Sequence, residues 1–559
     1  MASLQAYQSH GRRYFRIVES FRQDGKPRIR VLAHLGRAED ILQLVQNRSA
    51  HLRVSSVTAG SVTALWHLAQ QLDVVGKINR AVAGTRGQVQ KRDGLTVGES
   101  LLAAMIGRAC APRSKRAFAG WAQTTLLPQL MGFAARDLTS EHFWEQMHAV
   151  PVGKLADIEQ QIVRQVIAIE QLEIQALAYD TTNFYTHIAT TNPKPLLPQR
   201  GHNKQGRHDL RQLGLALVVD QVSQLPLAHV LYEGARSDMK TFSQFLKPVR
   251  QRLRELSLQP QQLTLIFDAG ACSKENLALL SSGQDHYVTT VRPSYQVDLL
   301  SEAVAGLGEV ALSNGVLVRA WRTRRVIAGR EHEVVVVFSP QLFEGQMRGL
   351  HQHLKQYGGE LEKMGLRPKG TLEAVQRRLA KICGRQYVRA LIRYEITGKE
   401  HGPILVRSWC DLDEYQRLTT QYFGLRVLIT DRTEWTTAQI IEAYRGQSKA
   451  EAAFRDLKDP GMLATRPQFH WTDQKLHVHA FLCVTGYLLV RLLWRRAQRQ
   501  NGLAGSPRAL LADLARIRHC RIVDRTGRAG RPRVREQLED VEPSLYKLGQ
   551  ALGAIPPGH

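Results

Sequence analysis

The chain has 559 residues, which is too long for one ordinary domain, so about three to five modules are expected. Hydrophobic residues make up 43% of the chain, which favours a folded protein over a disordered one. The 76 Lys and Arg exceed the 50 Asp and Glu by enough to give a formal net charge of +26, so nucleic acid is the expected partner, with a membrane surface as its rival.

Residues 1–59 are expected to form a basic N-terminal hairpin segment. Apolar and basic residues alternate on both sides of a turn signal at residues 23–26, as in a β-hairpin. The first twenty residues lack the apolar core of a signal peptide. Residues 60–171 change to helical spacing, with Thr139 or Ser140 as a cap for the last short helix, and are predicted to form a helical module.

Residues 172–291 and 424–500 are predicted to form one α/β core in two parts, because short apolar runs alternate there with helical stretches. Residues 292–423 lie between the two parts and are interpreted as a strand-rich insertion domain. An apolar run at residues 480–490 is too short to span a membrane and indicates a buried helix. Residues 501–559 form a basic C-terminal region.

Six cysteines lie far apart without a CxxC pair. This spacing argues against both a zinc knuckle and a disulfide framework, and it favours the reducing cytoplasm.

Two of the apolar runs end in aspartate. Asp180 ends the run at residues 176–180, and Asp268 ends the run at residues 264–268. Ligands gather beyond the carboxyl ends of parallel strands, so the two carboxylates can meet there and bind a hard cation such as Mg²⁺. Either aspartate taken alone is more typical of a turn or a helix cap, so the pair is the stronger signal.

Glu451 lies in the helical stretch TTAQIIEAYRGQSKAEAAFRDLKD, seven residues after Tyr444 and seven before Lys458. Seven residues are about two helical turns, so the three side chains share a face. Glu451 suits a metal ligand there, and Lys458 suits a phosphate contact. The alternative is an ordinary amphipathic helix with a solvated, charged side.

The order strand-Asp180, strand-Asp268, strand-rich insertion, helix-Glu451 resembles the DDE transposases of bacterial insertion sequences, in the branch numbered sixteen-thirty-four of the insertion-sequence-four superfamily. The stretches that are similar are AYDTTNFY, GHNKQGRHDLRQLGLALVVD, EGARSDMKTF, FDAGACSKENLALL, and YRGQSKAEAAFRDLKD with the following ATRPQFHWTDQKLHVHAFLC. The resemblance implies an RNase H-like catalytic core, of α/β class, interrupted by a β-rich insertion domain. The N-terminal hairpin and helical module would precede this core, and the helical and basic C-terminal region would follow it.

The superfamily's signature is a Tyr, two residues, an Arg, three residues, the Glu, six residues and a Lys. Tyr444, Glu451 and Lys458 keep this register, whereas Gln447 stands at the arginine position. A phosphate contact therefore cannot be carried over to that position, and Arg445 and Arg455 are the candidates to replace it.

The resemblance implies that Asp180, Asp268 and Glu451 are catalytic and hold two Mg²⁺ ions, with Mn²⁺ as the alternative ion. The implied reactions are DNA cleavage at the end of a mobile element and attack of the freed 3′-hydroxyl on target DNA. The implied partner is double-stranded DNA, as terminal inverted repeats and as target, bound by a homodimer. The expected location is the bacterial cytoplasm, on the nucleoid when DNA is bound, with no membrane partner.

The candidate DNA contacts are Tyr444, Arg455, Lys458, Lys204, Arg207 and Arg466. For Lys204 and Arg207, on the loop after the first aspartate, a solvated basic loop is an equal alternative. The resemblance places recognition of the terminal repeats in residues 60–171. The segment RTGRAGRPRVR is similar in part to a minor-groove hook, but a basic hairpin or linker is the favoured interpretation.

Two other functions remain open at this point. The first is an RNase H-like, metal-dependent nuclease that cuts DNA without joining it. The second is a non-catalytic DNA-binding descendant of a transposase, for which the loss of a carboxylate would be the expected sign. All three carboxylates are present.

Overall fold

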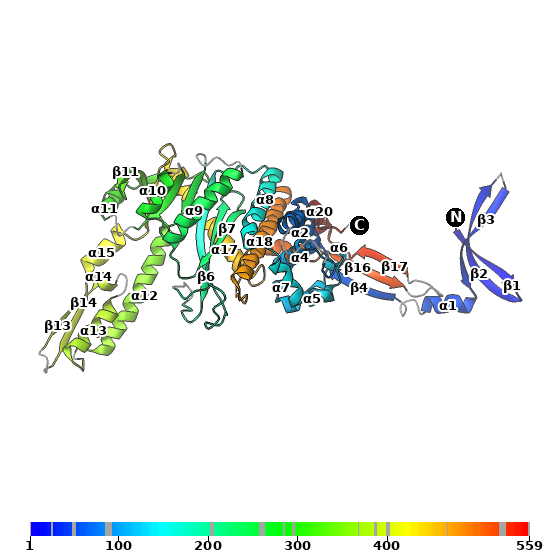
Figure 1. The fold of residues 1–559 in the computed structure, drawn as a ribbon, viewed down its shortest axis with the longest axis horizontal. Helices are drawn as coiled ribbons and strands as arrows, with labels where there is room; N and C mark the ends of the chain where they lie inside the picture. The colour runs from blue at the N-terminus through cyan, green and yellow to red at the C-terminus, as the bar shows by residue number, and fades with distance from the viewer. Residues whose placement is uncertain are drawn as a thin grey trace. The chain divides into compact units, whose positions relative to one another are not determined.

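A computed structural model describes residues 2–23, 26–46, 52–83, 92–201, 206–256, 263–282, 285–292, 297–366, 368–384, 388–398, 403–466, 468–524 and 533–556. The chain divides into two compact units, which are described separately. The first unit comprises Met1–Ala149 and Leu489–His559, and the second comprises Val150–Leu488. Figure 1 shows both units, with labels on many of their elements.

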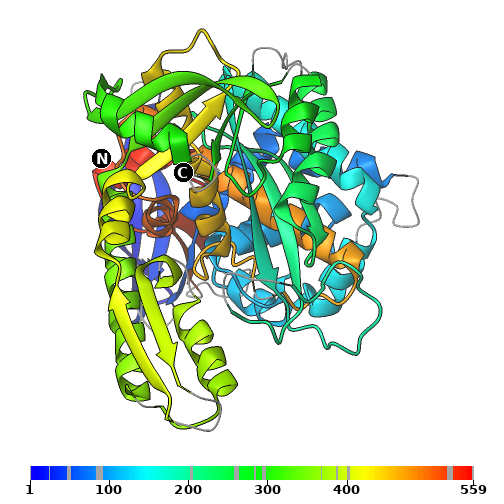
Figure 2. The ribbon, with the colours of Figure 1, turned by 90° about the vertical axis from the view of Figure 1, so that its left-hand side faces the viewer.

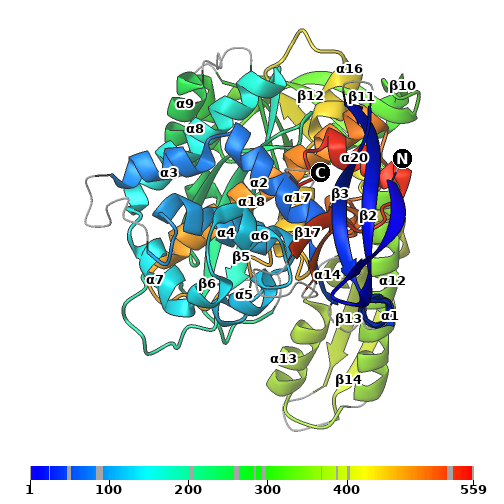
Figure 3. The ribbon, with the colours of Figure 1, turned by 90° about the vertical axis from the view of Figure 1, so that its right-hand side faces the viewer.

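The first unit begins with a three-stranded antiparallel sheet in the order β1-β2-β3, drawn in dark blue in Figure 3. The expected hairpin corresponds to β2 and β3, which pair as far as Gln23↔Lys26. Its turn residues Asp24 and Gly25 lie outside the described residues. The elements of this segment are β1 (Ala2–Ser9), β2 (Arg12–Gln23), β3 (Lys26–Gly36) and α1 (Ala38–Gln46).

The rest of the first unit is mainly helical. Thr139 caps α7 by accepting a hydrogen bond of 3.2 Å from the backbone N–H of His142. A second small sheet has the strand order β17-β16-β4. The elements are β4 (Leu52–Thr58), α2 (Gly60–Gln71), α3 (Val74–Val82), α4 (Val97–Cys110), α5 (Lys115–Ala122), α6 (Leu127–Met131), η2 (Ala135–Asp137), α7 (Ser140–His148), α19 (Pro507–Leu514), β16 (Arg518–Asp524), β17 (Arg533–Leu538) and α20 (Pro543–Ala551).

Helix α18 (Asp473–Asn501) is long and apolar enough to cross a membrane by length and composition alone. However, 94% of its most apolar window is buried inside the protein. Burial on this scale is typical of the core helix of a soluble protein, and it matches the buried helix expected at residues 480–490.

The second unit is built on a mixed nine-stranded sheet with the order β10-β11-β12-β15-β9-β8-β5-β6-β7. Only the pairs β5–β8 and β8–β9 are parallel, and the other neighbours are antiparallel. The strands are β5 (Ala176–Tyr185), β6 (Gln212–Asp220), β7 (Pro226–Glu233), β8 (Thr264–Phe267), β9 (His286–Val291), β10 (Gly308–Ala311), β11 (Leu317–Ile327), β12 (Arg330–Phe338) and β15 (Leu425–Thr430).

Helices cover both faces of this sheet, so its central strands are buried on both sides. On one face, side chains such as Tyr179 and Phe267 pack with the helices α8 (Val152–Glu170), α9 (Asp238–Glu255), α10 (Lys274–Ser282) and α11 (Val297–Gly306). On the other face, Ile266 and Val288 pack with α16 (Thr437–Arg445), which α17 (Ser448–Lys458) follows. Alternate residues of one strand therefore face different helices.

The region expected to be an insertion domain is divided in the structure. Strands β10, β11 and β12 belong to the large sheet, because β12 pairs with β15 from Glu333↔Thr430 to Phe338↔Leu425. The apolar run VVVVF in β12 is typical of such a doubly buried strand. The rest forms a separate layer, in which the hairpin β13–β14 packs with helices, as Figure 2 shows in yellow-green. Its elements are α12 (Pro340–Met364), α13 (Leu372–Cys383), α14 (Val388–Leu391), β13 (Ile392–Thr397), β14 (Leu405–Cys410) and α15 (Leu412–Gln421).

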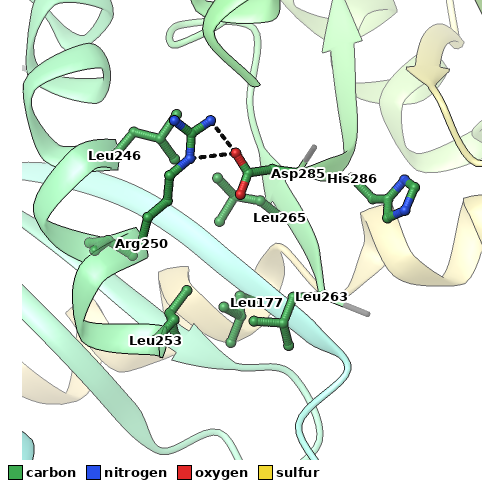
Figure 4. Close-up of a pocket in the computed structure, with 9 residues that line it drawn as sticks. Leu177, Leu246, Arg250, Leu253, Leu263, Leu265, Asp285 and His286 are labelled. Carbon is green, nitrogen blue, oxygen red and sulfur yellow. Dashed lines mark hydrogen bonds and ion pairs between the residues drawn. The ribbon is translucent and has the colours of Figure 1, made fainter. Parts of the chain in front are cut away.

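A small apolar cavity of about 20 Å³ lies between α9 and the sheet (Figure 4). Arg250 forms an ion pair with Asp285 at its rim, and leucines such as Leu246 and Leu265 line it. This volume holds about one water molecule, so the cavity is a packing defect of the core rather than a ligand site.

Candidate active site

Asp180 and Asp268 lie side by side at the carboxyl ends of two parallel strands. The pairing of β5 with β8 ends at Ala178↔Ile266, and each aspartate follows two residues later. Side chains two residues apart on a strand share a face, and neighbouring strands are about 4.8 Å apart. Both carboxylates therefore project on the side of the sheet that α16 covers.

Local backbone contacts hold both carboxylates in place. The Oδ1 atom of Asp180 accepts a hydrogen bond of 2.7 Å from the backbone N–H of Thr181. The Oδ1 atom of Asp268 accepts one of 2.9 Å from the backbone N–H of Gly270, in the turn that follows β8. Asp180 is half-buried and Asp268 is exposed, so solvent reaches both side chains.

Glu451 reaches the same site from the first turn of α17. The expected single helix through Tyr444 and Glu451 is divided into α16 and α17 at Gly446 and Gln447. At this junction the backbone forms tighter hydrogen bonds three residues apart, for example from the N–H of Ala450 to the carbonyl of Gln447 at 3.1 Å. Despite the break, Tyr444, Glu451 and Lys458 border one cleft.

This cleft has a volume of about 1380 Å³. That is larger than the roughly 300–1000 Å³ of small-molecule pockets, so a polymeric ligand suits it better. Its lining includes three carboxylates and a set of basic residues that come from α16, α17, β11 and β15. The charged lining residues are Asp180, Asp268, Glu451, Arg319, Arg426, Arg445, Arg455 and Lys458.

Aromatic rings position several of these cations. The Nζ atom of Lys458 lies 5.4 Å from the ring centre of Phe184 and 5.8 Å from that of Phe454, and it donates a hydrogen bond to Thr182 Oγ1. The guanidinium of Arg426 lies 5.2 Å from the ring centre of Tyr444. Thr182 and Asp180 share a side of β5, so Lys458 is held close to the first carboxylate.

Comparison with known families shows which family the chain belongs to. A family model described as "Transposase DDE domain" matches residues 172–485, which are more than half of the chain. A second, described as "IS1634 family transposase, N-terminal domain", matches residues 5–54. The chain is a DDE transposase of the IS1634 family. It is therefore an enzyme that acts on DNA.

Two solved structures are similar to this transposase. One is a piggyBac transposase synaptic complex with hairpin DNA, at 8% identity and a TM-score of 0.40, covering 81% of this chain and 79% of that chain. The other is a Mos1 transposase paired-end complex with the left transposon end, at 9% identity and a TM-score of 0.16, covering 38% and 62%. Both TM-scores are low, so the family assignment stands on the two sequence matches. No curated protein sequence matches the chain.

The predicted site residues of the transposase divide into two groups. Besides the three carboxylates, Tyr444, Arg455 and Lys458 line the cleft. Arg207 does not line it, and instead forms an ion pair of 2.9 Å with Asp209. Arg466 also lies outside the cleft lining. Lys204 and the hook residues 530–532 lie outside the described residues.

Tyr444 is 9% exposed, and burial raises the pKa of its hydroxyl; Arg426 lowers this pKa, Asp268 and Glu451 raise it, and the net shift is upward. A tyrosine that resists deprotonation is a poor nucleophile. Its position between Arg426 and two carboxylates indicates a packing and positioning role in the wall of the cleft.

Four residues of the site escaped the sequence prediction. Thr181 donates a hydrogen bond of 2.9 Å from its Oγ1 atom to Asp238 Oδ1, which brings the start of α9 next to the Asp180 strand. Arg319 and Arg426 supply cations from the strands β11 and β15. Two of the four had a sequence signal, because Thr181 lies in AYDTTNFY and Asp238 in EGARSDMKTF, stretches that resemble the family but gave these residues no role.

The lining of the cleft suits a divalent cation in its chemistry, because carboxylate oxygens are the ligands that hard cations prefer. DDE transposase domains generally depend on divalent metal ions. Among the residues that the structure describes, no three His, Cys, Asp or Glu side chains are close enough to enclose an ion. An ion bound by all three carboxylates would therefore require these side chains to come closer together.

Proposed function

We propose that this cleft is the active site of an RNase H-like core, in which Asp180, Asp268 and Glu451 catalyse DNA cleavage and strand transfer. The main support is the common register of the two aspartates beyond Ala178↔Ile266, with Glu451 bordering the same cleft. In this proposal α12 to α15 and the β13–β14 hairpin form the insertion that precedes the glutamate helix.

The three carboxylates would hold two Mg²⁺ ions, or Mn²⁺ in their place. When bound, such ions supply positive charge that activates the attacking oxygen and stabilises the leaving oxygen. Asp180 on β5, Asp268 after the neighbouring strand β8 and Glu451 on α17 would supply the carboxylate oxygens that hold these ions.

The basic residues of the cleft would bind the DNA backbone. Arg455 and Lys458 follow Glu451 on α17, and Arg445 lies at the end of α16, so all three can contact phosphates next to the scissile bond. Arg319 and Arg426 extend this basic surface across the cleft. Their charges offset the repulsion between the carboxylates and the phosphodiester.

Two in-line displacements at phosphorus follow from this arrangement. In the first, water attacks the phosphodiester at the element's end, and the P–O bond to the 3′ oxygen breaks to leave a free 3′-hydroxyl. In the second, that hydroxyl attacks a target phosphodiester, a new P–O bond forms, and a target 3′-hydroxyl leaves. The protein supplies no nucleophile, consistent with the buried hydroxyl of Tyr444.

The DNA partners in this proposal are the terminal inverted repeats and the target duplex. Residues 60–171, which include the helices α2 to α7, are the proposed site of repeat recognition. Two paired ends need two active sites, so we propose a homodimer on DNA, located at the nucleoid in a bacterial cytoplasm. Lys204, Arg207 and Arg466 stay candidates for contacts to DNA outside the cleft.

The direct test uses duplex DNA from the sequences that flank the gene, with intact and pre-cleaved ends. Asp180→Asn, Asp268→Asn and Glu451→Gln remove one charge each with little change in shape. We expect each variant to lose cleavage and joining by at least about a thousandfold, while end binding persists because it depends on Lys and Arg. Asp413→Asn, on the exposed surface of α15, is the matched control.

The outcomes separate the candidate functions. Full activity in one carboxylate variant would remove that residue from the site. Cleavage by the unsubstituted protein without a joined product would favour a nuclease, and binding without either reaction in Mg²⁺ or Mn²⁺ would favour a non-catalytic descendant.

A further inference from the structure

Gln447 occupies the junction between α16 and α17, four residues before Glu451. Residues four apart on a helix lie on the same face, and both side chains line the cleft that Asp180 also lines. The side chain of Gln447 is 6% exposed and forms part of the cleft lining. A buried amide at this position needs partners, because an unpaired polar group is costly to bury.

The amide nitrogen of Gln447 binds the strand that carries Asp180. Its Nε2 atom donates a hydrogen bond of 2.8 Å to the carbonyl oxygen of Tyr179, the residue directly before Asp180. The pairing of β5 with β8 ends one residue earlier, at Ala178↔Ile266. The side-chain amide therefore supplies a donor immediately beyond the end of the parallel ladder.

A second glutamine fixes the other side of the junction. The Nε2 atom of Gln221 donates a hydrogen bond of 2.8 Å to the carbonyl of Ala443 at the end of α16. The backbone N–H of Gln221 donates one of 3.0 Å to the carbonyl of Ala176 on β5. Gln447 therefore ties the start of α17 to β5, and Gln221 ties the end of α16 to the same strand.

The amide oxygen of Gln447 does not help to hold the side chain in this way. Its Oε1 atom is buried and has no hydrogen-bond partner among the described residues. The donor alone therefore accounts for the position of this side chain. The arginine of the superfamily signature could make the same donor contact, but it would add a positive charge beside the carboxylates.

We propose that Gln447 is a positioning residue that sets Glu451 relative to Asp180 by binding the Tyr179 carbonyl, in place of the signature's arginine. The inference rests on the proposed function, because the spacing of these two carboxylates matters when they bind a common ion. Groups that orient metal ligands typically change metal affinity or activity about 10- to 100-fold when they are removed.

The test measures Mn²⁺ binding to the full-length protein on end DNA, by the loss of the free-ion signal in electron paramagnetic resonance. Gln447→Met keeps the length of the side chain but has no donor, and we expect its Mn²⁺ affinity to fall about 10- to 100-fold. Gln447→Arg keeps a donor but adds a positive charge beside the carboxylates, so its Mn²⁺ affinity should fall only about fivefold, less than that of the methionine variant. Gln416→Met, on the exposed face of α15, is the matched control and should change nothing.

Each outcome bears on the proposal. Unchanged Mn²⁺ affinity in a folded Gln447→Met variant would overturn it, and so would a folded Gln447→Arg variant that binds as weakly as the methionine variant. If the methionine variant does not fold, the arginine variant still decides. Unchanged Mn²⁺ affinity in Glu451→Gln would instead refute the proposed function, whereas loss in Glu451→Gln without loss in Gln447→Met would refute only the role of Gln447.

Discussion

Asp238 connects the start of α9 to β5 and approaches the turn after β8. Its Oδ1 atom accepts the hydroxyl of Thr181 at 2.9 Å. A Cβ atom added at Gly270 would lie 3.1 Å from Asp268 Oδ1 and 3.5 Å from Asp238 Oδ2, so the Asp238 and Asp268 carboxylates both approach the same side of Gly270. Burial raises the pKa of Tyr179, and Asp238, Asp180 and Asp268 all add to that effect. Negative charge is thus concentrated at the proposed ion site.

We expect Asp238→Asn to weaken divalent-ion binding while stabilising the ion-free protein. Asparagine still accepts the Thr181 hydroxyl, so the change removes mainly a negative charge. A solvent-accessible charge at this range contributes on the order of 1 kcal/mol, or about fivefold in the half-saturating Mn²⁺ concentration. Cleavage titrated with Mn²⁺ and melting without metal are the two measurements. Asp413→Asn serves as control, and an unchanged Mn²⁺ requirement would contradict the expectation.

The junction between α16 and α17 shows what a local sequence pattern predicts and what it does not. The seven-residue register predicted that Tyr444, Glu451 and Lys458 border one site, and all three line the cleft. The register did not predict the break between them. Its cause is non-local: Gln447 binds Tyr179, 268 residues away, and Gln221 binds Ala443, 222 residues away. No periodicity within the helix contains that information.

Gly446→Ala should weaken this junction by displacing Gln221. A Cβ atom at Gly446 would lie 2.3 Å from the Gln221 amide, which must then leave its place on the Ala443 carbonyl. The expected cost is about the net value of one hydrogen bond, roughly 0.5–1.5 kcal/mol of unfolding free energy. Chemical denaturation gives this value directly.

A double-mutant cycle with Gln221→Ala distinguishes this clash from general helix effects. Because the shorter side chain vacates the space, the glycine substitution should cost little in that background. Equal costs in both backgrounds would show that Gln221 is not the obstacle.

The sequence predicted the central strands of the large sheet but did not place β10 to β12 at one edge of it. The strands that carry Asp180 and Asp268 follow from apolar runs that end in aspartate, and their parallel pairing placed the two carboxylates together. Strands β10 to β12 have equally clear patterns but were assigned to an insertion domain. Only the pairing of β12 with β15, across about ninety residues, decides where they belong, and strand pairing at that range leaves no local signal. Because β11 was assigned to the insertion domain, Arg319 was not expected at the site.

At the scale of the whole molecule, the net charge is +26, and five Lys and Arg against three Asp and Glu line the cleft. Arg319 and Arg426 border it, each with its guanidinium over an aromatic ring, at 5.9 Å from the centre of Phe338 and 5.2 Å from that of Tyr444. A guanidinium held in this way loses less freedom when it binds a phosphate. Both arginines are therefore expected to contact the DNA backbone.

This expectation has a quantitative consequence for salt dependence. Each phosphate contact releases about 0.9 counterion from duplex DNA, so Arg319→Gln and Arg426→Gln should each lower the slope of log affinity against log salt by about 1. Fluorescence anisotropy with end DNA at several salt concentrations measures this slope. Arg377→Gln, on α13 with Glu373 as its ion-pair partner at 3.4 Å, is the matched control. If a cleft variant has the same slope as the control variant, the substituted arginine does not contact the DNA backbone. If its slope is reduced with random-sequence DNA as well as with end DNA, the arginine contacts a phosphate without reading the sequence.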